Sequence, residues 1–308
     1  MSDALRLDHG ISVVDTDFVR PRFDASFLIV ENGRAAFVET GPNSAVPHLL
    51  AALEAHGLER DAVDYVIPTH VHLDHAGGAG LLMQHLPRAK LVIHPRGARH
   101  MIDPSVLMQG VRAVYGAEVA ARDYGELVPI PAERVITTTD GMVVELSGRP
   151  LLFADTPGHA RHHHCIWDEA SRGWFTGDTF GIVYPELAPY IVPATAPVQF
   201  DHEALRASVA RLLAKRPEFM YLTHFGAVRD AEQLAGQYLL QVDAMADVAR
   251  SLADEPGRHD KLKRAFGDIY IAELRRSGST QSENFLRDIL AMDIELNAQG
   301  LGTWLDRN

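Results

Sequence analysis

Three histidines and one aspartate lie close together in residues 69–78, which read THVHLDHAGG. An apolar run at 65–67 precedes this segment, and Gly80 opens a stretch typical of a helix, so the pattern predicts a loop between a strand and a helix. Imidazole and carboxylate groups are the usual protein ligands of zinc, iron and manganese. The four side chains, His70, His72, Asp74 and His75, therefore predict a metal site; the alternative is a histidine-rich surface loop.

Three more candidate ligands follow apolar runs further along the chain. His159 comes after Pro157-Gly158, Asp178 after Gly177, and His224 after Thr223. With His70, they make four predicted strands that end in a possible ligand. This repetition is explained if each strand delivers its carboxyl end to the same edge of a two-sheet core with helices outside. The sequence thus predicts an α/β fold of the αβ/βα sandwich type, a four-layer arrangement.

The connecting elements have recognisable local signals. Two hairpins are predicted, at 26–38 around Asn32-Gly33 and at 143–154 around Ser147-Gly148. A helix that carries Val46 and Leu49 is expected to be capped by Asn43 or Ser44, and the last strand is expected at 220–222. The insert at 95–131 predicts one or two helices whose role the sequence leaves open.

The pattern changes after Val228, where only amphipathic helices are predicted. Three are expected, and the third begins with a capping box from Thr280 to Glu283. We therefore expect a catalytic domain at 1–228 and a helical extension at 229–308. The extension packs on the core, forms a homodimer interface or covers the substrate pocket, and the sequence does not choose among these roles.

Composition restricts the function further. The 308 residues carry a net charge of −12, which disfavours nucleic acid and anionic membranes as partners. The first residues lack the apolar segment of a signal peptide, and no run is long enough to span a membrane. The single cysteine, Cys165, allows no intrachain disulfide and is expected to be buried in a strand. These features predict a cytoplasmic protein that acts on a small molecule.

The motif His-x-His-x-Asp-His, a histidine after Pro-Gly, a Gly-Asp pair and a late histidine together resemble the metallo-β-lactamase superfamily over residues 1–228. The resemblance implies two metal ions. It also implies that Glu39 occupies a position where the superfamily usually has aspartate, and that His163 supports the ligands from behind. Its implied ligands are His70, His72 and His159 for the first ion, Asp74, His75 and His224 for the second, and Asp178 between them.

The ungapped motif is similar to that of the hydrolytic branch, which includes glyoxalase II thioesterases and homoserine lactonases. This implies a dinuclear hydrolase, with Zn²⁺ as the expected metal and Fe or Mn as alternatives. A metal-bound hydroxide would attack the carbonyl of an ester, lactone or thioester while Asp74 orients it and moves its proton. The expected pocket residues are Phe180, Tyr184, Tyr190 and Arg161.

Two other classes stay open. One is a diiron oxidoreductase, although relatives of that kind usually have glutamate in place of His72. The other is a regulatory protein that keeps the metal site without hydrolysing a substrate.

Overall fold

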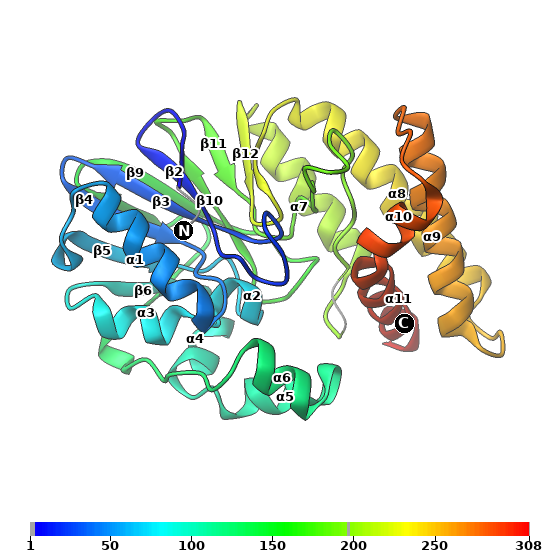
Figure 1. Cartoon of the computed structure of the whole chain (residues 1–308), viewed down its shortest axis with the longest axis horizontal. Helices are drawn as coiled ribbons and strands as arrows, with labels where there is room; N and C mark the ends of the chain where they lie inside the picture. The colour runs from blue at the N-terminus through cyan, green and yellow to red at the C-terminus, as the bar shows by residue number, and fades with distance from the viewer. Residues whose placement is uncertain (1–3, 196–197, 308) are drawn as a thin grey trace. The chain divides into compact units, whose positions relative to one another are not determined.

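The computed structural model describes residues 4–195 and 198–307, and contacts within the chain divide it into two units (Figure 1). The first unit comprises Met1–Asp155, His162–Gly177 and Glu218–Val228. The second comprises Thr156–Arg161, Asp178–Pro217 and Arg229–Asn308. The helical segment after Val228 thus shares a unit with two shorter segments from the middle of the chain.

A seven-stranded sheet in the first unit has its strands in chain order. Neighbours are antiparallel from β1 to β4 and parallel from β4 to β7. The first predicted hairpin is confirmed, since Asn32 and Gly33 have φ angles of 46° and 76°, as a tight turn requires. The strands are β1 (Leu5–Arg6), β2 (Ile11–Asp15), β3 (Ala25–Glu31), β4 (Arg34–Val38), β5 (Val63–Ile67), β6 (Lys90–Ile93) and β7 (Val135–Thr137).

A six-stranded sheet in the same unit has the order β13-β12-β11-β10-β9-β8. The second predicted hairpin, β8–β9, is confirmed, and Cys165 is buried in β10 as expected. The expectation that the strand at 220–222 is the last is wrong, because β13 follows it. The strands are β8 (Val143–Leu146), β9 (Arg149–Asp155), β10 (His164–Asp168), β11 (Gly173–Phe175), β12 (Phe219–Leu222) and β13 (Gly226–Val228).

Three short strands, β1, β7 and β13, are not predicted by the sequence pattern. Each has two or three residues, too few to show an alternation of apolar and polar side chains.

The two sheets enclose one apolar core, in which the ring of Phe27 meets those of Phe175 and Tyr221 edge to face at 5.2 and 5.7 Å. The other face of the seven-stranded sheet is covered by α1 (Val46–Ala55), α3 (Ala79–His85) and α4 (Pro95–Ile102) (Figure 1). These helices bury the apolar stripes that the sequence predicts. The seven-stranded sheet is therefore packed on both faces, which fixes the positions of its strand ends.

Two local expectations in this unit are wrong. Asn43 does not cap α1; it begins the 3-10 turn η1 (Asn43–Ala45), and its amide Nδ2 donates to the carbonyl of Glu126 at 2.8 Å. The insert contains three helices, since Gly116, with φ 86°, separates two of them. The remaining elements are α2 (Leu73–Ala76), α5 (Ser105–Tyr115), α6 (Ala117–Asp123), η2 (Arg60–Ala62) and η3 (Ala132–Arg134).

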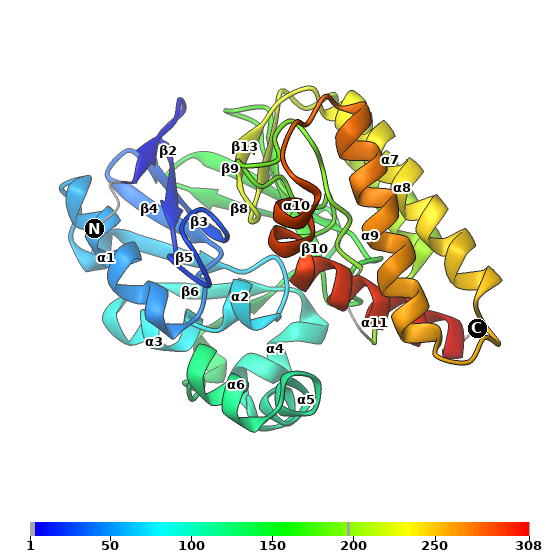
Figure 2. The ribbon, with the colours of Figure 1, turned by 45° about the vertical axis from the view of Figure 1, so that its right-hand side comes forward.

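The second unit is helical. Residues 229–307 contain no strand, as expected, but four helices instead of three, because α10 ends at Ile289 and α11 begins at Ala291. Figure 2 shows α8 and α9 side by side. The predicted capping box is also wrong: Ser282 caps α10 by accepting from the Phe285 N–H. The helices are α7 (His202–Ala214), α8 (Ala231–Ser251), α9 (Arg258–Arg276), α10 (Glu283–Ile289) and α11 (Ala291–Arg307).

None of the helices in residues 4–195 and 198–307 is long and apolar enough to cross a membrane. The predicted domain boundary at Val228 stays a prediction.

Candidate metal centre

The histidine-rich segment folds as the predicted loop between a strand and a helix. Strand β5 ends at Ile67, and α2 begins at Leu73. The rings of His70 and His72 lie 4.4 Å apart, centroid to centroid, and those of His70 and His75 lie 4.1 Å apart. The turn into α2 thus brings side chains from both sides of the loop together.

His224, which follows β12, meets the same segment within the first unit. Its Nε2 is 3.5 Å from Oδ2 of Asp74, and Nε2 of His75 is 3.7 Å from that oxygen. One ligand atom from each of the three side chains lies within 4.8 Å of the others. The spacing is that of groups that could hold one metal ion.

The protons on these two imidazoles support this interpretation. Nδ1 of His224 donates to the carbonyl of Phe23 at 2.8 Å, and Nδ1 of His75 donates to Glu39 at 2.9 Å. In the neutral ring the proton is then on Nδ1, so each Nε2 turns a lone pair toward Asp74. A cation between these lone pairs and the carboxylate would be bound favourably, and the donor set suits zinc, iron or manganese.

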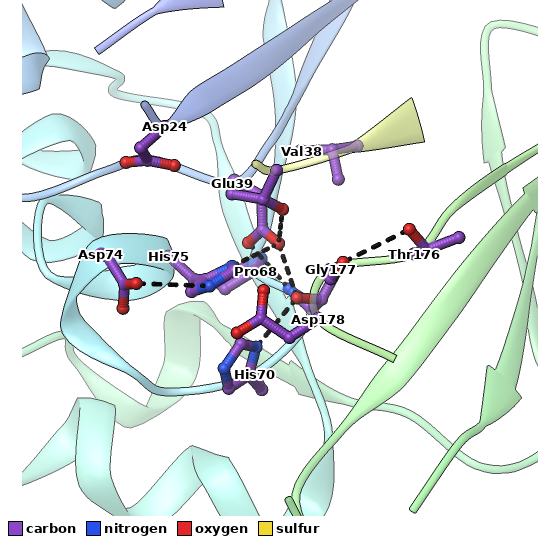
Figure 3. A network of polar contacts seen from close by, with 12 residues as sticks. Asp24, Val38, Glu39, Pro68, His70, Asp74, His75, Thr176, Gly177 and Asp178 are labelled. Atoms are coloured by element: carbon purple, nitrogen blue, oxygen red, sulfur yellow. Dashed lines mark hydrogen bonds and ion pairs between the residues drawn. The ribbon is translucent and has the colours of Figure 1, made fainter. Parts of the chain in front are cut away.

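Glu39 connects the elements that carry these ligands (Figure 3). Its buried carboxylate accepts from the Thr69 N–H and hydroxyl, at 3.0 and 2.5 Å, and from the Thr223 hydroxyl at 3.1 Å. It also accepts from His75, as Figure 3 shows. Thr69 follows β5 and Thr223 follows β12, so one carboxylate fixes two strand ends and one imidazole. These contacts distribute its buried charge over four donors.

His70 is held in the same way. Its Nδ1 donates to Oγ1 of Thr69 at 3.1 Å, because the Thr69 hydroxyl donates its own proton to Glu39. The His163 ring stacks on His70 with 4.8 Å between centroids and 27° between planes. The residue before Asp178 has to be a glycine, because Gly177 has φ 47° and a Cβ there would lie 2.3 Å from Oγ1 of Thr69.

The second unit carries the other two candidate ligands. Nε2 of His159 lies 3.3 Å from Oδ2 of Asp178, and both residues are buried. Nδ1 of His159 donates to the carbonyl of Ala194 at 2.9 Å. The neutral imidazole therefore again turns the lone pair of Nε2 toward a carboxylate.

Helix α7 holds the Pro-Gly-His loop. The Ser208 hydroxyl donates to the carbonyl of Pro157 at 2.6 Å, and the Asp201 N–H donates to that of Gly158 at 2.8 Å. Gly158 has φ 138°, and a Cβ there would lie 2.4 Å from Cα of Leu205. A side chain would not fit, so the loop and helix need this glycine. Asp201 caps α7, as the sequence predicts.

The expected pocket residues lie in the second unit. Phe180, Tyr184 and Tyr190 are at most 1% exposed. The hydroxyl of Tyr184 donates to Asp293 at 3.1 Å, and that of Tyr190 donates to Gln241 at 2.5 Å. Arg161 is exposed. The pocket role of these four residues stays a prediction.

A cavity of about 220 Å³ lies within the first unit, and none of the predicted site residues lines it. Burial lowers the pKa of His164, which lines it, to about 3, with nearby His94 contributing. The lining residues are His94, Pro95, Thr138, Thr139, Asp140, Phe153, Asp155 and His164.

Sequence reasoning misses the groups that orient the imidazoles. Thr69 and Thr223 had a usable signal, because each directly precedes a candidate histidine at a strand end. Asp24, a separate buried carboxylate of the first unit, has no signal in the sequence: it accepts from Thr16 at 3.0 Å, and burial raises its pKa to about 7. The carbonyls of Phe23 and Ala194 are also invisible in the sequence, since every residue has one.

Comparison with known proteins places these observations in a family. The family model described as "Metallo-beta-lactamase superfamily" matches residues 19–224. The chain is 28% identical over 222 residues to the metallo-beta-lactamase fold-containing protein ST1585 of Sulfurisphaera tokodaii, covering 70% of this chain and 80% of that protein. The crystal structure of ST1585 aligns with a TM-score of 0.69 and 20% identity, over 96% of this chain and 99% of that one. This confirms the predicted αβ/βα sandwich fold.

Two fungal relatives carry names that include an activity. The chain is 28% identical over 155 residues to an "Atrochrysone carboxyl ACP thioesterase" of Aspergillus fumigatus, and 24% identical over 219 residues to "Thioesterase pkgB" of Emericella nidulans. It spans only 39% and 50% of the lengths of these two proteins, and 50% and 70% of this chain is aligned. Because the family model covers more than half of the sequence, the chain belongs to the metallo-β-lactamase superfamily.

Proposed function

We propose that this protein is a dinuclear metal-dependent hydrolase that cleaves a small ester, lactone or thioester. The observation that carries the proposal is the group Asp74, His75 and His224, whose ligand atoms lie within 4.8 Å of one another. Both imidazoles in the group donate their Nδ1 proton to the protein and so keep Nε2 for a metal.

The proposed ligands follow the order of motifs in the superfamily. Asp74, His75 and His224 hold one ion, and Asp178 serves both. His70, His72 and His159 complete the ligand set by holding the other ion. We propose Zn²⁺, because imidazole nitrogen and carboxylate oxygen are among its usual ligands.

When bound, two such ions supply a water activated near neutral pH and a Lewis acid for the carbonyl. The side chain of Asp74 is 24% exposed, whereas those of His75 and His224 are at most 5% exposed. The carboxylate of Asp74 can therefore both bind a metal ion and exchange a proton with water or substrate. Glu39 keeps the His75 ring in a single tautomer and orientation.

The class of substrate rests on weaker support. Two fungal relatives are named thioesterases, which favours a thioester among the three candidates. The net charge of −12 supports a small-molecule substrate over a nucleic acid.

The test begins with metal-free protein, reconstituted separately with zinc, iron and manganese. We expect two equivalents of metal and chelator-sensitive hydrolysis of at least one class in a panel of esters, lactones and thioesters. The rate should rise with pH around an apparent pKa of about 7.

Each alternative predicts a different result. One equivalent of metal in fully reconstituted protein contradicts the dinuclear centre. Iron-dependent oxygen consumption without hydrolysis indicates an oxidoreductase, and two bound metals with no turnover indicate a regulatory protein.

A further inference from the structure

Asn297, on α11, is a buried amide of the second unit whose side chain bonds to residues on both sides of Ala194. It is 1% exposed. Its Oδ1 accepts from the N–H and the hydroxyl of Thr195, at 2.6 and 2.8 Å. Its Nδ2 donates to the carbonyl of Pro193 and to the hydroxyl of Tyr270, both at 2.8 Å. Both lone pairs and both protons of the amide are thus used.

The residue between these two anchor points is Ala194. Its carbonyl accepts the Nδ1 proton of His159 at 2.9 Å. One side chain therefore fixes the backbone immediately before and immediately after the carbonyl that sets the tautomer of a candidate ligand. Asn297 is distant from Ala194 in sequence, and no ligand motif of the chain includes it.

We propose that Asn297 is a positioning residue for His159, so that a helix of the carboxyl-terminal segment controls one side of the metal centre. The proposal rests on the proposed function, in which His159 binds metal. The four hydrogen bonds of the Asn297 amide all go to other residues of the protein. Asn297 acts through Ala194, whose carbonyl keeps Nε2 of His159 directed toward Asp178.

Loss of the amide has a definite physical consequence. Without Asn297, the Pro193 carbonyl and the Thr195 N–H lose their side-chain partner in the interior, so the segment shifts to find others or admits water. The Ala194 carbonyl shifts with it, and the His159 ring loses its fixed orientation. Groups that orient a ligand from behind typically change metal affinity by about 10–100-fold.

The experiment compares Asn297→Ala with Asp293→Ala. Asp293 is a matched control because it is also buried and also on α11, and its carboxylate accepts from the hydroxyl of Tyr184. Metal-free forms of the wild type and both variants are titrated with Co²⁺, and bound metal is followed by visible absorption and calorimetry. Thermal unfolding of each metal-free protein gives the loss of stability to be compared with the loss of affinity.

We expect Asn297→Ala to weaken one of the two equivalents about 10–100-fold and to change the other by less than about threefold. Asp293→Ala should lower the unfolding temperature but leave both affinities near those of the wild type. If Asn297→Ala does not fold, Thr195→Val removes only the contacts of the Thr195 hydroxyl with Asn297 and should weaken the same equivalent by a smaller factor.

A second readout needs no metal. Nitrogen-15 spectra of the imidazoles, with His159 assigned by a His159→Gln variant, should show the Nδ1–H tautomer in metal-free wild type. Asn297→Ala should give a mixture of tautomers, and Asp293→Ala should not. Failure of this readout overturns the positioning role, whereas wild-type protein that binds no metal but shows the tautomer contradicts only the proposed function.

Equal metal affinities in Asn297→Ala and wild type would overturn the inference. So would an equal loss of affinity in both alanine variants, because the effect would then come from general instability.

Discussion

The candidate ligands are held by two different means, of which support by side chains is described for the first unit alone. In the first unit, His70 and His75 are oriented by side chains, through Glu39 and the hydroxyl of Thr69. His159 in the second unit is oriented by a main-chain carbonyl, that of Ala194, as His224 in the first unit is by that of Phe23. A side-chain support is visible in the sequence and can be removed by one substitution. A main-chain support depends on everything that fixes the backbone, so its weak points lie elsewhere in the chain.

The largest difference between the two units is expected when one candidate carboxylate ligand is removed from each. Asp178→Ala should lose most bound metal and nearly all activity, because Asp178 is proposed to serve both ions. Asp74→Ala should retain more metal, since it contributes to one ion only. Metal content of the reconstituted variants and their hydrolysis rates measure the difference. Two tightly bound equivalents in Asp178→Ala would show that this residue is not shared.

The side-chain support of the first unit is tested with Glu39→Gln. The amide is nearly isosteric, but its NH₂ group has to face donors that now point at a carboxylate. We expect metal affinity or activity to fall about 10–100-fold. Glu133→Gln, at an exposed position, is the control and should behave like the wild type. Unchanged affinity in Glu39→Gln would mean that the strand ends hold His75 without this carboxylate.

The loop that carries His159 in the second unit is tested with Ser208→Ala. This change removes the hydrogen bond to the carbonyl of Pro157 but leaves Gly158 packed against α7. We expect a loss of stability of about 1 kcal/mol and a much smaller effect on affinity than in Glu39→Gln. Ser251→Ala, at an exposed position, is the control. A large loss of metal affinity in Ser208→Ala would mean that the orientation of His159 depends on this one side-chain hydrogen bond.

The last prediction concerns the acid sensitivity of the first unit and does not involve the metal. Burial lowers the pKa of His164 from 6.5 to about 3, so the unfolded chain binds a proton over that range and the folded chain does not. Stability of the metal-free protein should therefore fall as the pH drops below about 6.5. His164→Gln should reduce the dependence of the unfolding free energy on pH between about 6 and 4, measured by denaturant titration. An identical slope in both proteins would contradict the assignment.

The same contrast explains what the sequence could predict. The order of strands and the seven candidate ligands follow from apolar runs that end in histidine or aspartate, a local pattern. The hairpins follow from Asn32-Gly33 and Ser147-Gly148, because a tight turn needs positive φ. The fold and family are confirmed by comparison, while the complete ligand set stays a proposal.

What the sequence could not predict depends on packing or on short elements. Strand β13 has three residues and no period. The break between α10 and α11 falls in a continuous apolar pattern, so the pattern predicts one helix. Asn297 lies on an amphipathic helix like many others, and its hydrogen bonds are set by the segment that packs against it.

The bond between Asn297 and residues 193–195 also has a consequence for synthesis. A chain leaving the ribosome carries all seven candidate ligands once His224 is made, and the strands of both sheets once Val228 follows. The amide that fixes Ala194 is made much later, with α11. A nascent chain arrested after β13 therefore has every proposed metal-binding group but lacks the clamp on His159, and it should bind one of the two ions at full affinity only when the last helix has been translated.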